Sequence, residues 1–418
     1  MSDPMYAAIS GLNASQAMLG VVGENIANVD TVGYKSSSIN FEQALQQTLS
    51  GASAPTATVG GINPVQEAAG GAVNVAGVEI NTNEGTLQST GINTNLAIQG
   101  NGYFVVQTPQ GGLGYTRAGD FTMDANGNMV DPNGNKVLGW ASTTVANGQQ
   151  TATNMVPLAV PPNQTEAALA TNSIAFAGNL NSQDQTDAVP VTVYDSQGNQ
   201  IPVTLTFTNQ STTGGTTWNV GYSYQLSGSS TPVPATGSTP IGTVDFSKTP
   251  PTYTSTGNIS ITPNDGSAAI SFALKSADFA NLTDYAMTTQ MTATANGNAA
   301  GTLQNFTIGS DGTITGSFSN GGTKVLGQVA LANFANPAGL LNAGNNLWQQ
   351  SPNSGNPLVG TASSGQLGSI AAGELEGSNV GLANEFVNMI VAQEGYQANS
   401  KVITIAQTLD TTLVNMVQ

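Results

Sequence analysis

The chain contains no cysteine and no histidine among its 418 residues. Without thiols or imidazoles it cannot form disulfides or the usual Cys and His zinc sites, and it cannot build a Cys nucleophile or a His-based catalytic triad. Most enzyme mechanisms are thereby excluded. We therefore predict a protein that is not an enzyme and that needs no cofactor.

Charge is also scarce, and it is almost all of one sign. Charged residues make up 7% of the chain, and 7 Lys and Arg face 24 Asp and Glu, which gives a formal net charge of -17. Such a surface repels polyanions, so we expect neither nucleic acid nor an anionic membrane as a partner. No apolar run is long enough to span a bilayer, and we expect that the protein uses no cleaved Sec-type signal. We expect no membrane insertion.

What the chain does have is glycine and short runs of β-forming residues. Its 50 Gly and 19 Pro separate segments rich in Thr, Val, Ile and Tyr, which is typical of short strands joined by tight turns. Residues 41–49 are instead predicted to add one or two helical turns. The strands expected with most definition cover residues 95–98, 103–106, 121–123, 136–140, 189–194 and 201–207.

Two amphipathic segments, residues 5–28 and 380–417, frame this β-rich middle. Their apolar residues recur at alternating spacings of three and four, which is the pattern of a coiled-coil seam. Polar or small residues interrupt both seams, so neighbouring copies are expected to complete their coverage. Ordinary terminal helices packed on the body of the protein are the alternative. The predicted interface positions are Ile9, Leu12, Leu19, Ile26, Leu382, Phe386, Met389, Tyr396, Ile403 and Leu413.

The predicted fold class is mainly β with α-helical termini. A chain of this length allows about two to four domains, and we expect nested all-β domains, a complex β-fold carrying an inserted β-sandwich or barrel, together with a terminal coiled-coil pair. The expected parts are 1–28 with 374–418 as a terminal coiled-coil domain, 29–75 as a connector, 76–145 with 301–373 as a middle β-domain, and 146–300 as an inserted outer β-domain.

A calcium loop is the strongest metal-like pattern in the chain. Oxygen-bearing side chains recur at alternate positions over residues 124–135. The sixth position, however, is Met129 instead of Gly, and the twelfth is Asn135 instead of a bidentate Glu. Each half contains Asn-Gly, the favoured dipeptide of two-residue hairpin turns. We therefore favour two structural hairpins and predict no metal site.

Paired carboxylates could support glycoside hydrolysis without histidine. The nearest pairs in sequence are Glu374 with Glu376 and Asp184 with Asp187. All four lie in polar, loop-like stretches, so a solvated surface is the favoured interpretation.

With these exclusions made, several motifs resemble the signatures of the bacterial flagellar rod and hook family. The motifs at the ends are SGLNA at 10–14, NIAN at 25–28, TVGYK at 31–35, LEGSNV at 375–380 and YQANSK at 396–401. Those in the middle are GNGYF at 100–104, YTR at 115–117, GDF at 119–121 and FANP at 334–337. The signature residues carried over are Asn25, Ala27, Asn28, Thr31, Gly33, Tyr34, Lys35, Ser378, Asn379 and Val380.

This resemblance, strengthened by the large insert at 146–300, implies a self-assembling subunit of the flagellar hook, a tubular universal joint between rod and filament. It implies terminal helices paired around an export channel and outer β-domains. It also implies type III export and partners in the rod, the hook cap, the hook–filament junction and the export apparatus. Asn25, Asn28, Ser378 and Asn379 are expected to satisfy backbone groups at contacts between subunits.

Two alternatives stay open. A distal rod subunit is similar but shorter, and it would lack an ordered outer domain over 146–300. A secreted carbohydrate-binding β-protein or glycosidase would require a carboxylate-lined cleft and measurable glycan affinity.

Overall fold

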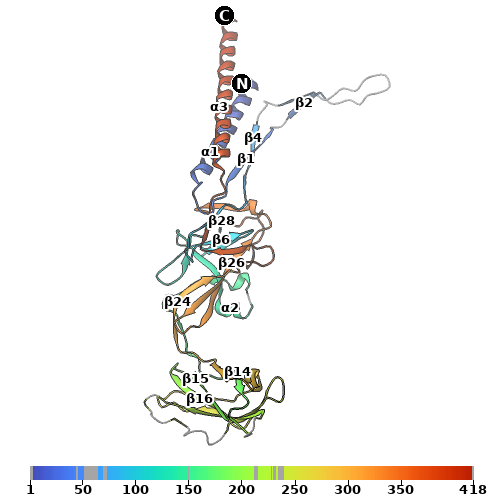
Figure 1. The fold of residues 1–418 in the computed structure, drawn as a ribbon. Helices are drawn as coiled ribbons and strands as arrows, with labels where there is room; N and C mark the ends of the chain where they lie inside the picture. Colours follow the sequence, from blue (N-terminus) through green and yellow to red (C-terminus); the bar gives the residue numbers. More distant parts are fainter. Residues whose placement is uncertain are drawn as a thin grey trace, which may run out of the picture. The chain divides into compact units, whose positions relative to one another are not determined.

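The structure is a computed structural model (Figure 1). It describes residues 3–43, 46–50, 65–68, 73–148, 150–210, 215–226, 228, 232–233 and 240–416. The chain forms two compact units. The first unit is Met1–Pro161, Thr307–Thr315 and Val325–Gln418, and the second unit is Pro162–Phe306 and Gly316–Lys324.

Two long helices form one end of the first unit. α1 covers Asp3–Ala27 and α3 covers Leu382–Met416. They run side by side in opposite directions (Figure 1), so that Gly11 adjoins Asn399 while Ser15 adjoins Gly395. The predicted helical termini are therefore confirmed, and they pack on each other.

A two-stranded ribbon follows α1 and packs beside it. β1 (Ser37–Gln43) pairs antiparallel with β4 (Val73–Ile80), and β2 (Gln46–Ser50) pairs with β3 (Val65–Ala68). The helical turns predicted for 41–49 are wrong, because the described residues of that stretch are strands. Polar and apolar residues alternate in Ser-Ile-Asn-Phe, and this period of two is typical of a strand with one exposed face and not of a helix. Within the predicted connector, residues 44–45, 51–64 and 69–72 lie outside the described residues.

The β-structure of the first unit is built from short antiparallel strands. In its main sheet, β26 (Thr323–Asn333), β11, β7, β8, β28 and β27 are neighbours in this order. The core beneath it gathers buried aromatic side chains, with the rings of Tyr115 and Phe334 packed edge to face at 4.8 Å. The strands and the short helix are β5 (Leu87–Ser89), β6 (Leu96–Gln99), β7 (Tyr103–Gln107), β8 (Leu113–Thr116), β9 (Thr122–Met123), β10 (Met129–Val130), β11 (Lys136–Ala141), α2 (Ser142–Ala146), β12 (Val156–Pro157), β27 (Leu341–Gly344), β28 (Leu347–Gln349), β29 (Leu358–Thr361), β30 (Ser369–Ala372) and β31 (Glu374–Glu376).

The second unit is a β-sandwich. A five-stranded antiparallel sheet, β15-β16-β17-β18-β19, and a three-stranded sheet, β22-β14-β23, share one core. Burial alternates along β16, as the period of a strand with one covered face requires. The chain passes between the two units through β24, β25 and β26. The bounds are β13 (Thr165–Glu166), β14 (Ile174–Asn181), β15 (Thr186–Tyr194), β16 (Gln200–Asn209), β17 (Thr217–Tyr224), β18 (Gly242–Asp245), β19 (Thr252–Ser255), β20 (Ile259–Ile261), β21 (Ile270–Phe272), β22 (Asn281–Tyr285), β23 (Gln290–Ala295), β24 (Gly301–Ile308), β25 (Thr313–Phe318) and β26 (Thr323–Asn333).

Aromatic rings fill the space between the two sheets of the sandwich. Phe176 of β14 stacks on Phe279 at 4.8 Å and meets Phe207 of β16 edge to face at 5.6 Å. All three side chains are buried. The mainly β fold with an inserted sandwich is therefore confirmed.

Candidate assembly interface

The contact between α1 and α3 is lined by small side chains. Ala8 and Ala14 of α1 and Ala392 and Ala406 of α3 are buried. A Cβ atom added to Gly11 would lie 2.6 Å from the Asn399 side chain. Small residues let helix backbones approach closely, and the pair is in close contact where Gly11 meets Asn399 and where Gly395 meets Ser15.

Many of the large apolar side chains of α3 face solvent. On α3, Val387, Ile390 and Val391 are each 58% exposed, and Leu409 is 65% exposed. Exposed large apolar side chains in such number mark a contact with another molecule or with a further copy. The helices thus supply one covered seam inside the chain and one uncovered apolar surface.

The predicted interface positions divide between these two surfaces. Leu12, Leu19, Ile26, Met389 and Ile403 are half-buried, whereas Ile9, Leu382, Phe386 and Tyr396 are exposed. Leu413 lies in α3, but its side chain is outside the described residues. The prediction missed Ala392 and Ala406, which form the covered seam, because it followed the largest apolar residues.

A buried ion triad fixes the chain where it leaves α1 and where it enters α3. The Nζ atom of Lys35 lies 2.6 Å from Oε1 of Glu376, and Nη1 of Arg117 lies 3.7 Å from Oε2. All three side chains are at most 5% exposed. Burial lowers the pKa of Lys35, and the hydrogen bond and charge of Glu376 oppose that change. The ions are stable only as a set, since a buried charge without its partner is costly.

Further hydrogen bonds tie the triad to the backbone. Lys35 also donates to the carbonyl of Asn83, and Arg117 donates to the carbonyls of Ile98 and Gly100. The backbone N–H of Gly85 donates to Oε1 of Glu376. Glu376 was predicted to lie on a solvated surface, and that prediction is wrong. Its cationic partners are distant in sequence, so no local pattern revealed its burial.

Two asparagines complete the junction between the helices and the β-structure. Asn25 donates to the carbonyl of Ser37 and to Glu385, and it accepts from Tyr34 and from the Ser37 backbone. Burial and then the nearby acids Glu24 and Glu385 raise the pKa of Tyr34 to about 12. These side chains satisfy groups within one chain.

Asn379 has the same role on the other side of the junction. It accepts from the Ser36 backbone and donates to the carbonyls of Asn81 and Asn83. Gly33 makes the close approach possible, because its φ is +68° and a Cβ there would lie 2.6 Å from the Ala118 nitrogen. Six of the ten signature residues thus meet within one chain: Asn25, Gly33, Tyr34, Lys35, Ser378 and Asn379 lie in or beside this junction.

The other signature residues lie at its edge. Asn28 donates to the carbonyl of Glu24 and accepts from Thr31. Ala27 is exposed, and Val380 is half-buried.

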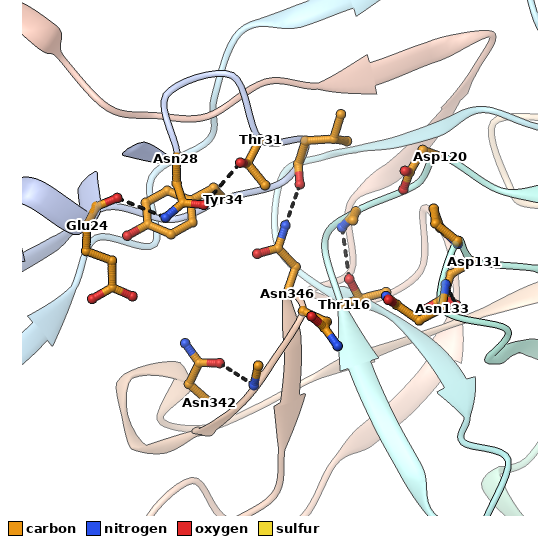
Figure 2. Close-up of a pocket in the computed structure, with 15 residues that line it drawn as sticks. Glu24, Asn28, Thr31, Tyr34, Thr116, Asp120, Asp131, Asn133, Asn342 and Asn346 are labelled. Carbon is orange, nitrogen blue, oxygen red and sulfur yellow. Dashed lines mark hydrogen bonds between the residues drawn. The ribbon is translucent and has the colours of Figure 1, made fainter. Parts of the chain in front are cut away.

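A pocket of about 460 Å³ opens beside the junction (Figure 2). Carboxylate and amide side chains dominate its lining, including Glu24, Asp120 and Asn346, and the lining contains neither Lys nor Arg. Asn346 donates to the carbonyl of Val32. Burial, and then Asp131, raises the pKa of Asp120.

The loops that resemble a calcium site are hairpin turns. Oδ1 of Asp124 accepts from the backbone N–H groups of Asn126 and Asn128. Asp131 repeats this arrangement with Asn133 and Asn135. The carboxylates thus hold their own loops, and the described residues contain no group of three or more acidic side chains placed to hold a metal. None of the described helices is both long and apolar enough to cross a bilayer.

Comparisons with known proteins assign this architecture. A profile described as Flagella basal body rod protein matches residues 5–35, one described as Flagellar hook protein FlgE/F/G D1 domain matches 97–179, and one described as Flagellar basal body rod FlgEFG protein C-terminal matches 371–416. The flagellar hook protein FlgE of Salmonella typhimurium is 35% identical over 431 residues, covering 98% of both chains. The chain belongs to the flagellar hook protein family.

The hook protein of Borreliella burgdorferi supports the same assignment, at 32% identity over 446 residues and 100% of both chains. The crystal structure of Helicobacter pylori flagellar hook protein FlgE2 has a similar fold, with a TM-score of 0.54, 16% identity, and coverage of 69% of this chain and 100% of that one. This family member is a structural component of the flagellar hook. The distal rod alternative is not favoured, because the match to hook proteins extends over the whole chain, residues 146–300 included.

Proposed function

We propose that this chain polymerises into the tubular hook, in which α1 and α3 form an inner layer around the export channel and the β-structure lies outside. The exposed apolar surface of α3 carries this proposal, because α1 covers only its alanine-rich face. Inner helices held by hydrophobic burial would transmit torque from rod to filament, whereas polar outer contacts could slide as the tube bends.

The domain limits expected from the sequence become part of this proposal. In it, residues 1–28 with 374–418 form the inner layer, 29–75 connect it outward, 76–145 with 301–373 form the middle layer, and 146–300 form the outer layer. The ion triad of Lys35, Glu376 and Arg117 supports it, since it joins the helix ends to the first unit's β-structure. Force applied to the helices would pass into the β-structure through this junction.

The partners are proposed on the same basis. The rod would bind the first subunits, a cap would guide addition at the growing end, and junction proteins would follow the last. Export would run through the flagellar type III apparatus. The uncovered helices should gain order on assembly, because burial in a neighbour supplies the stability that an amphipathic helix needs.

Electron microscopy tests the proposal directly. The purified full chain, seeded with hook fragments, is expected to give regular tubes, and a version without residues 1–28 and 380–418 is expected to stay monomeric. A glycan-binding screen is the control for the carbohydrate-binding alternative. Equal assembly by both versions, or a full chain that stays monomeric with seeds, would refute the inner-helix account.

A further inference from the structure

An acidic side chain lies among the core residues of the second unit without a hydrogen-bond partner. It belongs to β22, where burial alternates so that Leu282 and Asp284 face inward, whereas Asn281, Thr283 and Tyr285 face solvent. Both carboxylate oxygens of Asp284 are buried, and neither has a hydrogen-bond partner of full geometry among the described residues. Such a carboxylate lowers the stability of the fold when it is ionised.

The indole of Trp218 is the second polar group in this part of the core. Its side chain is fully buried on β17, and its Nε1–H also lacks a well-formed hydrogen bond within the part of the chain that the structure describes. Burial raises the pKa of Asp284, and the Trp218 N–H opposes part of that rise. The two groups therefore face each other without reaching full hydrogen-bond geometry.

No ion pair of the described residues includes the Asp284 carboxylate. β14 and β23 contain no titratable residue, and β17 contains only two tyrosines, which are neutral at neutral pH. In the adjoining segments, Oδ2 atoms of Asp184 and Asp187 lie 3.3 and 2.9 Å from the Thr289 hydroxyl, and Asp278 accepts from a backbone N–H. None of these groups is a cation. The carboxylate escapes the cost of burial only by taking up a proton or by moving into water.

β22 is also the kind of strand that can move. It lies at one edge of the three-stranded sheet β22-β14-β23 and pairs in parallel with β14, with Leu180 opposite Asp284. An edge strand opens locally at a lower cost in free energy than a central strand, because it loses one set of ladder hydrogen bonds instead of two. The buried acid is thus carried by an element that can leave the core.

We propose that Asp284 makes β22 a proton-controlled strand of the second unit. With its proton, the carboxyl group stays in the core beside the Trp218 indole. Without the proton, the charged group is drawn toward water and β22 separates from β14 more often. Because folding raises the pKa of Asp284 above its ordinary value of 3.8, the stabilisation is present below that value and is lost as pH rises through the folded pKa.

Hydrogen exchange of the full chain, measured by mass spectrometry, tests this strand directly. D284N keeps the shape of the protonated carboxyl group and removes its charge. At pH 7 the amides of β22 should exchange about tenfold more slowly in D284N than in the wild type, because an unsatisfied buried charge is removed. At pH 3.5, below the ordinary pKa of an aspartate, the two proteins should exchange alike.

Asp187→Asn is the matched control. Asp187 is half-buried like Asp284, but the Thr289 hydroxyl donates to it at 2.9 Å. Its substitution should therefore not slow the exchange of β22 at either pH. Equal slowing in D187N and D284N, no slowing in D284N at pH 7, or the same slowing in D284N at both pH values would overturn the proposal.

The wild-type chain gives a second readout if circular dichroism shows that D284N is not folded. β16 is an interior strand of the five-stranded sheet and contains no titratable residue, so it serves as the internal reference. After correction for the intrinsic pH dependence of exchange, the ratio of β22 exchange to β16 exchange should rise about tenfold from pH 3.5 to pH 7. A ratio that stays constant would overturn the proposal.

Discussion

The terminal helices and the second unit handle their large apolar side chains in opposite ways. In the second unit Phe176, Phe207 and Trp218 are at most 1% exposed, within a core that two sheets close. On α3, residues of similar hydrophobicity such as Ile390 and Ile405 are 58% and 60% exposed. A segment that covers its own apolar surface is complete as a fold, whereas one that leaves it uncovered is complete only in an assembly.

The largest expected effect is on assembly and comes from α3. Ile405→Asp places a charge where a neighbouring subunit is expected to bury an apolar side chain, so tube formation should be lost at micromolar protein concentration. Sedimentation and electron microscopy measure it. Gln407→Asp adds the same charge at an exposed position about 200° around the helix, and it should assemble normally. Tubes from I405D would remove the contrast between the two regions.

In the second unit, a substitution in the closed core is expected to lower the stability of the fold and to leave assembly unchanged. Phe207→Ala opens a cavity between the sheets and should lower the free energy of unfolding by about 3–5 kcal/mol. Tyr285→Ala, at a side chain 63% exposed, should change it by less than about 0.5 kcal/mol. Urea unfolding followed by tryptophan fluorescence compares them. If F207A were to abolish tubes while the second unit stayed folded, the outer unit would belong to the assembly core.

A substitution at the junction between the helices and the β-structure is expected to have an intermediate effect. Glu376→Gln leaves Lys35 and Arg117 buried without a carboxylate, so the first unit should lose about 3 kcal/mol. Glu374→Gln, at a half-buried position two residues away, is the control. Thermal unfolding measures both variants. Equal effects would show that the triad contributes nothing beyond its strand.

The smallest expected effect concerns a loop of the second unit and depends on pH. Burial alone would raise the pKa of Asp195, but hydrogen bonds from Asn199, Ser267 and the Gln197 backbone outweigh it and lower the pKa to about 2. A pKa lowered by folding stabilises the protein above the unfolded value of 3.8, and this contribution disappears as pH falls toward 2.

Asp195→Asn should therefore cost about 1 kcal/mol at pH 7 and almost nothing near pH 2. Urea unfolding at both pH values measures the difference. A deficit that stays constant with pH would assign the effect to packing instead of to the charge.

Much of the fold could be read from local patterns. The period of two along residues 189–194 and 201–207 predicted β15 and β16, and the Asn-Gly pairs predicted the hairpin turns at 126–127 and 133–134. The spacing of three and four predicted α1 and α3. These features depend on neighbours within a few residues, which the sequence shows directly.

Other features escaped prediction because they depend on distant residues. Phe41 was assigned to a helix, yet it belongs to β1, whose partner strand begins only at Val73. Glu376 read as a surface acid because its two cations lie 341 and 259 positions away.

The sequence by itself determined that the chain is a β-rich protein with helical ends and that His- and Cys-based chemistry is absent, because composition and periodicity act locally. Only the tertiary structure decided which face of each helix is covered. The heptad pattern permits several faces to pack, and the close contact of Gly11 with Asn399 and of Gly395 with Ser15 selects the alanine-rich one. That selection leaves many large apolar residues of α3 uncovered, and these residues are the ones that we expect neighbouring copies to cover.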